Sequence, residues 1–174
     1  PGNSEPTTEI ADYSATGPYA VNVSSATTSV TDCSSMSYDI YSPQTAQEAP
    51  TVVLGHGFAR GADKMSGHAN HFASWGFEIL VPTLCHYNVW TGVDHEMNGQ
   101  NMMELATHHG ATQVVYAGQS AGGLAAIIAA SQDSKTVGVL GLDATDTQNI
   151  PGVDDFIGQQ YASNVAVPAF GLVG

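Results

Sequence analysis

Basic residues are nearly absent from this chain. Of its 174 residues only Arg60, Lys64 and Lys135 are basic, against sixteen Asp and Glu, so the formal net charge is −13 at pH 7. A protein of this charge repels the phosphates of nucleic acids and of anionic membranes. We therefore expect neither as a main partner. The charge suits a neutral or cationic substrate, but the interpretation that we favour is that the acidic residues serve solubility.

Long hydrophobic runs are also missing. No apolar run is long enough to cross a bilayer, so no membrane span is predicted. The chain begins at Pro1 with a polar stretch rich in Ser and Thr and has no apolar leader, as in a product whose targeting segment has been removed. Together with the scarcity of lysine, this predicts a secreted or periplasmic protein.

Cysteine is scarce. Cys33 and Cys85 are the only two, and they form one disulfide if the compartment is oxidising. The alternatives are two unrelated buried thiols, or a bond from either cysteine to a partner outside the chain. The sequence gives no distance between them and leaves all three open.

Strand and helix patterns alternate along most of the chain. A length of 174 residues fits one domain, which we place at 19–174 after a polar arm at 1–18. Alternating polar and apolar residues predict antiparallel strands at the sheet edge at 19–23, 28–31 and 37–41. Buried strands are predicted at 51–55, 77–82, 113–117, 136–142 and 165–173, and helices at 65–75, at 97–108 and from 121 onward. This order predicts an α/β fold with an open, mostly parallel sheet and helices on both faces.

The chain is organised around the segment Gly118-Gln119-Ser120-Ala121-Gly122-Gly123. An apolar strand pattern precedes it and a helical pattern follows, which is the context of a nucleophile elbow. A serine on such a strained turn exposes its hydroxyl, and small residues two before and two after it let strand and helix pass closely. The alternative is a glycine-rich turn that carries a bystander serine. The pattern favours a serine hydrolase.

Three predicted rim positions support this interpretation. The segment His56-Gly57-Phe58, Ser120 and Asp143 each follow a predicted strand, so parallel topology places them at the same edge of the sheet. With these motifs in order, the chain resembles the α/β-hydrolase superfamily from about residue 19 to 174. Within it, the chain is most similar to the chlorophyllases, platelet-activating-factor acetylhydrolases and cutinase-like polyester hydrolases.

The resemblance implies a role for each of these residues. Ser120 matches the nucleophile, and the backbone N–H groups of Phe58 and Ala121 match the oxyanion hole. Asp143 matches the acid of the triad, with Asp146 as the near alternative and a residue outside the chain as a third. The implied activity is carboxylic-ester hydrolysis through an acyl-enzyme, with no cofactor. Phe58, Tyr87 and Trp90 are candidates for the wall of an apolar substrate pocket.

The triad histidine is the missing part. It follows the serine and the acid in this superfamily, yet the last of the seven histidines, His109, precedes Ser120. We therefore expect an incomplete hydrolase, in which the final strand, the last helix and the base come from a second polypeptide or a C-terminal fragment. A strand that stops at Gly174 would leave an open sheet edge, which favours such a partner segment.

Three rival functions remain at this point. A serine peptidase uses the same machinery, and a hydrolase-like binding protein without activity would also lack the histidine. A metal enzyme is the third, because His68 and His71 share a predicted helix and the segment Asp94-His95-Glu96 offers further ligands. No zinc-binding motif accompanies them, so no metal site is predicted.

Overall fold

The structure is a computed structural model that describes residues 11–45, 48–88, 90, 92–146 and 156–173. Within these residues, seven strands form one sheet in the spatial order β1-β2-β4-β3-β7-β8-β9. Their bounds are β1 Val21–Val30, β2 Cys33–Pro43, β3 Thr51–Gly55, β4 Glu78–Pro82, β7 Val114–Gln119, β8 Thr136–Leu142 and β9 Ala169–Leu172. The β1–β2 and β2–β4 pairs are antiparallel, and the others are parallel. A separate antiparallel pair joins β5 Tyr87–Asn88 to β6 Gly92–Val93.

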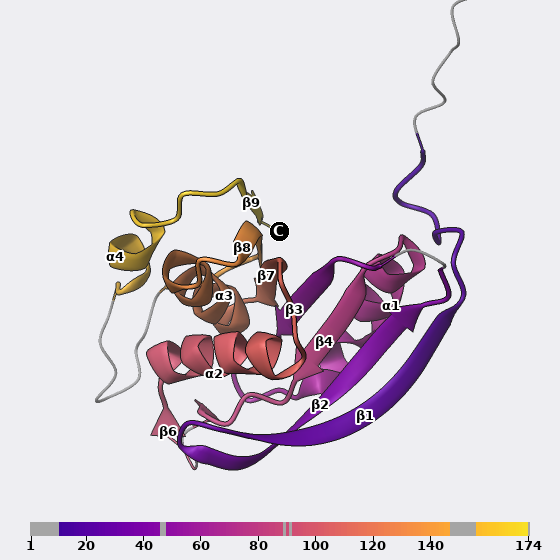
Figure 1. Cartoon of the computed structure of the whole chain (residues 1–174). Helices are drawn as coiled ribbons and strands as arrows, with labels where there is room; N and C mark the ends of the chain where they lie inside the picture. The colour runs from indigo at the N-terminus through magenta and orange to yellow at the C-terminus, as the bar shows by residue number, and fades with distance from the viewer. Residues whose placement is uncertain (1–10, 46–47, 89, 91, 147–155, 174) are drawn as a thin grey trace, which may run out of the picture.

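Helices cover both faces of the sheet. The helical segments are η1 Ala62–Met65, α1 Ser66–Ser74, α2 His95–His108, α3 Ala121–Gln132 and α4 Gly158–Ala162. Helices α2 and α3 lie together on one face, and α1 lies on the other (Figure 1). The mostly parallel sheet with helices on both faces confirms the predicted fold class. None of the helices in the described part of the chain has the length and apolar character needed to cross a membrane.

Strand β3 shows why the sheet is buried on both sides. All five of its residues are buried, and its successive side chains point to opposite faces. Val53 packs in the core beneath α2 and α3, whereas Leu54 packs in the core beneath α1. A parallel strand between two helical layers therefore reads as a continuous apolar run, as the sequence shows at this position.

The two predicted edge strands at 19–23 and 28–31 are in fact one continuous strand, so that prediction was wrong in detail. Strand β1 pairs with β2 through the whole polar middle of the segment, for example Ser25 with Asp39 and Thr27 with Ser37. Ser25 Oγ also donates a hydrogen bond to Asp39 Oδ1 at 2.6 Å. Polar side chains are tolerated there because one face of this antiparallel pair is exposed.

The last strand also differs from its prediction. The apolar pattern at 165–173 predicted a buried strand, but β9 is shorter and all four of its residues are exposed. Strand β9 pairs with β8 and is the outermost strand of the sheet in the described part of the chain. Its apolar side chains face solvent there, with Phe170 70% and Leu172 62% exposed. Apolar composition alone could not reveal its place at the edge.

A disulfide bond joins Cys33 to Cys85, which resolves the three alternatives left by the sequence. It connects the first residue of β2 to the segment that follows β4. The described part of the predicted arm packs on the end of α1, where the rings of Tyr13 and Trp75 are 4.7 Å apart. Residues 1–10 of that arm lie outside the described residues.

Candidate active site

Ser120 occupies the sharp turn between β7 and α3. Its backbone has φ 54° and ψ −120°, in the left-handed half of φ space that a residue with a side chain rarely adopts. Such a conformation costs of the order of 1–3 kcal/mol and persists only where the surroundings enforce it. The turn therefore has the strained backbone that the sequence pattern predicts for a nucleophile elbow.

The glycines around Ser120 explain how the turn is enforced. A Cβ atom on Gly118 would lie 2.1 Å from the carbonyl oxygen of Gly122, so strand and helix approach to backbone contact there. A Cβ atom on Gly123 would lie 2.7 Å from the Cβ of Ala144 in the segment after β8. Neither approach leaves room for a side chain. Direct contacts thus explain why small residues surround the serine.

The turn after β3 lies against the side chain of Ser120. A Cβ atom on Gly57 would lie 3.4 Å from Ser120 Cβ and 2.6 Å from Gln119 Oε1. Phe58 and Ala121 both line one small cavity of about 10 Å³, enough for about one water molecule. In the described part of the chain, neither of their amides donates to another protein group. Ala121 is also the first residue of α3, where the helix dipole is positive.

His56 is fully buried behind this turn. The backbone N–H of Leu84 donates to its Nε2 at 2.9 Å, so Nε2 carries no proton and Nδ1 must. His56 Nδ1 then donates to the carbonyl oxygen of Gly57 at 2.8 Å. Burial lowers the pKa of His56 below its ordinary 6.5, against smaller raising effects of the Gly57 carbonyl and of the charge on Asp63. The ring is therefore neutral and holds one tautomer.

Asp143 lies at the end of β8, beside the elbow. The backbone N–H of Ser120 donates to the carbonyl oxygen of Leu142 at 3.0 Å, and that of Thr145 donates to the carbonyl oxygen of Ser120 at 3.3 Å. Asp143 itself has φ 52° and is exposed. Within the described residues, no group donates a hydrogen bond to its carboxylate. The structure thus brings Asp143 to the same rim as Ser120, as the sequence predicted.

Asp146, the near alternative, already has a structural contact. Its Oδ1 accepts a hydrogen bond at 2.9 Å from the backbone N–H of Gly158, the first residue of α4. A Cβ atom on Gly158 would lie 2.9 Å from Asp146 Cγ, so the carboxyl group is held tightly against that helix. The geometry therefore favours Asp143 over Asp146 as the carboxylate that is open to a base.

Two histidines of the irregular stretch and of α2 lie closer to the site than the sequence suggested. His86 and His95 line the same cavity as Phe58 and Ala121, together with Asn98. His86 Nε2 is buried and has no hydrogen-bond partner in the described part of the chain. No histidine there is hydrogen-bonded to Ser120 Oγ. Asn98 could have been noticed, because it lies four residues before Met102 and so shares the buried side of α2.

The remaining candidate residues are dispersed. Tyr87 lines the cavity next to Phe58, whereas Trp90 is 92% exposed and does not line it. A substrate-binding role stays a prediction for Phe58, Tyr87 and Trp90.

The acidic residues considered as metal ligands have structural contacts. The side chain of Asp94 caps α2, accepting a hydrogen bond from Met97 N–H at 2.8 Å. Glu96 accepts a hydrogen bond from the hydroxyl of Tyr161, a contact that raises the pKa of Tyr161 to about 12.

The histidines considered as metal ligands do not form a metal-binding group. His68 and His71 both lie on α1, and His71 Nε2 contacts the carbonyl oxygen of Tyr13 at 3.0 Å. In the part of the chain that the structure describes, no three His, Cys, Asp or Glu side chains are placed to hold a metal ion together. The ligands offered by the segment 94–96 lie on α2 instead.

A shallow groove runs along the end of the sheet beside Asp143. Its volume is about 260 Å³, and it is lined by Gln119, Leu142, Asp143, Leu172 and Val173. Val173 is 88% exposed, and it follows the exposed apolar strand β9. The groove therefore connects the candidate acid to an apolar sheet edge.

Solved structures with a similar fold include an epoxide hydrolase, an α/β hydrolase and a hypothetical protein. The epoxide hydrolase CorEH matches with a TM-score of 0.61 and 20% identity, over 76% of this chain and 46% of its own. The α/β hydrolase GrgF from Penicillium sp. sh18 matches with a TM-score of 0.64 and 15% identity, over 72% of this chain and 47% of its own. A hypothetical protein from Pseudomonas aeruginosa matches with a TM-score of 0.65 and 16% identity, over 92% of this chain and 56% of its own.

These likenesses concern the fold, because all three sequences are less than 25% identical to this one. The chain spans about half the length of the solved structures it matches. No protein-family model matches the chain, and a search of curated proteins gives no match.

Proposed function

Since the chain has the α/β-hydrolase fold, we propose that it is a serine hydrolase of carboxylic esters. The observation that carries this proposal is the strained backbone of Ser120 at the end of β7, with Gly57 against its side chain and with Phe58 and Ala121 lining one small cavity. An enzyme needs a nucleophile clear of the backbone and donors for the oxyanion. In this proposal Ser120 is the nucleophile, and the amides of Phe58 and Ala121 are the donors. The base takes the proton of the Ser120 hydroxyl as its oxygen attacks the ester carbonyl, and the ester C–O bond breaks as the alcohol leaves with that proton. Water then hydrolyses the acyl-enzyme, which releases the carboxylic acid and restores Ser120.

The acid in this proposal is Asp143. Its carboxylate is exposed at the rim that carries Ser120, and it accepts no hydrogen bond from the described residues. An acid of the triad must orient a histidine, so its side chain has to be open to one. The net charge of −13 favours a neutral ester over an anionic one.

The base in this proposal is a histidine from outside residues 1–174. His56 is buried, neutral and bonded on both ring nitrogens, so it has no lone pair for Ser120. A segment that seats on the apolar edge of β9 would bring a histidine to the groove beside Asp143. A second polypeptide or a C-terminal fragment supplies that segment, and the whole acts outside the cytoplasm.

The proposal is tested with a fluorophosphonate probe on the assembled enzyme, meaning this chain with the segment that supplies its base. We expect labelling and hydrolysis of p-nitrophenyl acetate by the wild type, and neither in Ser120→Ala. Ser131→Ala is the matched control, because Ser131 is a half-buried serine on α3 that only donates to the carbonyl of Ile128. Equal labelling of Ser120→Ala and wild type would refute the proposal.

The rival functions predict other results in the same experiment. A binding protein without activity gives no turnover and no labelling, and a metal enzyme loses its turnover on addition of a chelator. A serine peptidase is labelled at Ser120 but hydrolyses a peptide amide at least as fast as the matching ester. Any of these outcomes would replace ester hydrolysis as the function.

A further inference from the structure

The turn that carries Phe58 rests on a segment from elsewhere in the chain, Leu84–Tyr87. The backbone N–H of Leu84 donates to His56 Nε2 at 2.9 Å, and the carbonyl oxygen of Tyr87 accepts from the N–H of Ala59 at 2.8 Å. The rings of His56 and Tyr87 also meet edge to face, with centroids 5.4 Å apart. One end of this segment is therefore attached to His56, before Phe58, and the other end to Ala59, after it.

That turn needs such support. Ala59 has φ 52°, a left-handed conformation that is unfavourable for a residue with a side chain. Phe58 itself is exposed, so packing of its ring contributes little to its position. The place of the Phe58 amide is then set by the hydrogen bonds of His56 and Ala59 to the Leu84–Tyr87 segment, together with the packing of the turn on the segment that carries Ser120.

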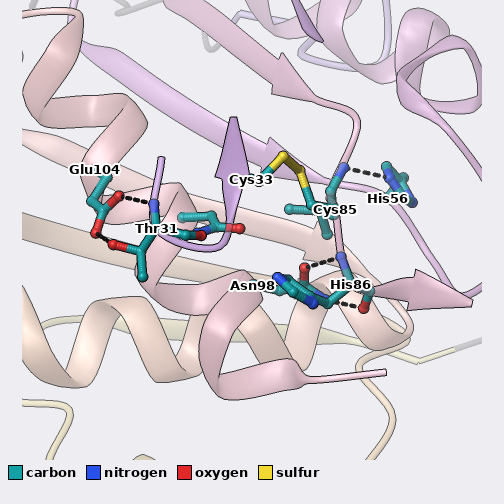
Figure 2. The surroundings of a disulfide bond; sticks show 9 residues. Thr31, Cys33, His56, Cys85, His86, Asn98 and Glu104 are labelled. Carbon is teal, nitrogen blue, oxygen red and sulfur yellow. Dashed lines mark hydrogen bonds between the residues drawn. A yellow bond between two sulfur atoms is a disulfide. The ribbon is translucent and has the colours of Figure 1, made fainter. Parts of the chain in front are cut away.

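The segment is fixed in turn at its two middle residues. Cys85 is bonded to Cys33 of β2, and His86 is held by Asn98 of α2 (Figure 2). Asn98 Oδ1 accepts from the N–H of His86 at 3.2 Å, and its Nδ2 donates to the carbonyl oxygen of His86 at 2.6 Å. One buried amide side chain thus satisfies both backbone groups of one residue, because it carries both a donor and an acceptor.

We propose that Asn98 is a positioning residue of the oxyanion hole, acting through His86 and the Leu84–Tyr87 segment on the amide of Phe58. This inference rests on the proposed function, since it assumes that the Phe58 amide stabilises an oxyanion. Asn98 touches no reacting atom in this account. Its contribution is geometric, because a displacement of about 1 Å at a reacting group can lower the rate a hundredfold.

The test compares two isosteric substitutions on the same helix. Asn98→Asp keeps the acceptor for His86 N–H but sets a carboxylate against the carbonyl of His86. Asn101→Asp is the matched control: Asn101 is also buried on α2, and its Nδ2 donates at 2.9 Å to the carbonyl of Thr31, which belongs to the β1–β2 turn. Both variants lose one buried amide-to-carbonyl bond, so both should lower the urea midpoint. Asn101→Asp should lower it at least as far, because Asn101 Oδ1 is buried without a hydrogen-bond partner in the described residues.

The readout that separates positioning from stability is the split between kcat and KM. In the assembled enzyme we expect Asn98→Asp to lower kcat for p-nitrophenyl acetate by roughly tenfold to a hundredfold, with KM nearly unchanged. Asn101→Asp should retain kcat within about threefold, as expected of a change outside the site. If both variants lose kcat equally, or if neither does while the wild type is active and Ser120→Ala is not, the inference is wrong but the proposed function stands.

A second measurement does not depend on activity. Hydrogen exchange of residues 56–60 reports directly on the turn, because the Ala59 amide is protected by Tyr87. We expect faster exchange there in Asn98→Asp and unchanged exchange in Asn101→Asp. If Asn98→Asp does not fold, the double variant Cys33→Ala with Cys85→Ala releases the same segment at its other attachment and should speed the same amides. Unchanged exchange in the variant that folds would overturn the inference.

Discussion

Gly122, in the first turn of α3, lies in backbone contact with Gly55 at the end of β3. A Cβ atom on Gly122 would lie 2.5 Å from both the carbonyl carbon and the carbonyl oxygen of Gly55, and 2.5 Å from the carbonyl oxygen of His56. All of these neighbours are backbone atoms, so none can swing aside. The nucleophile elbow and the turn that carries Phe58 are thereby packed directly on each other.

Substitution of Gly122 by alanine should therefore separate the two turns. We expect Gly122→Ala to lower the free energy of unfolding by about 3 kcal/mol, as overpacking between backbones does, and to reduce probe labelling of Ser120. Gly67→Ala is the control, because Gly67 lies in α1 and a Cβ atom there would have no neighbour within 4 Å. This substitution should raise the free energy of unfolding by up to about 1 kcal/mol, since alanine favours a helix more than glycine does. Equal urea midpoints for the two variants would contradict this prediction.

The strain at Ser120 should be measurable as stability. Ser120→Ala and Ser120→Gly both remove the hydroxyl, but only glycine relieves the backbone conformation at φ 54°. We expect Ser120→Gly to be more stable than Ser120→Ala by about 1 kcal/mol, after the entropic cost of glycine is subtracted. Urea unfolding of the two variants gives this difference directly. A more stable Ser120→Ala would show that the turn is not strained.

Burial of neutral His56 predicts acid sensitivity. The pKa of His56 is lowered on folding, so just below pH 6.5 the unfolded chain binds more protons than the folded one. The free energy of unfolding should then fall as pH drops below 6.5, and level off once pH is below the folded pKa. His56→Gln keeps a donor and an acceptor but cannot be protonated, so it should remove this part of the pH dependence. An unchanged pH dependence of unfolding in His56→Gln would contradict this prediction.

The predicted position of the base gives a kinetic test. His86 lies beside the site and has a buried Nε2 without a partner in the described residues. Of the histidines in this chain, it is therefore the one whose role as the base most needs to be tested. We expect His86→Asn to keep kcat within about tenfold and to leave the acidic limb of the pH–rate profile in place. Loss of a true base costs several orders of magnitude. A fall of that size in His86→Asn would place the base within this chain.

The elbow could be predicted from the sequence because its strain is encoded locally. Gly118, Gly122 and Gly123 lie within three residues of Ser120, and the strand and helix patterns flank them directly. The position of Asp143 at the same rim as Ser120 could be predicted from the topology, since the ends of parallel strands share one rim.

Other parts of the site depend on residues far apart in the chain. Leu84 lies 28 residues after His56, and Asn98 lies 12 residues after His86. No periodicity reports such hydrogen bonds, because they arise only when helices pack over strands. The exposure of β9 was unpredictable for the same reason, since apolar residues look alike whether another element covers them or not.

A partly buried hydrogen bond connects β7 to the end of α3, and its removal should loosen the turn between them that carries Ser120. Tyr116 of β7 donates from its hydroxyl to Asp133 Oδ2, at the end of α3, at 2.6 Å. Burial and this carboxylate both raise the pKa of Tyr116, so the phenol stays protonated and donating. Tyr116→Phe leaves the carboxylate without that donor and should cost about 1–3 kcal/mol of unfolding free energy.

Tyr38→Phe is the control for this change. Tyr38 is buried in the same core beneath α2 and α3, but its hydroxyl has no hydrogen-bond partner in the described residues. Its removal should therefore shift the urea midpoint little. Because Tyr116 and Asp133 connect the strand before Ser120 to the end of the helix after it, only Tyr116→Phe should also speed amide exchange at residues 118–123. Equal effects of the two substitutions on stability and exchange would mean that the Tyr116 hydrogen bond does not hold the elbow.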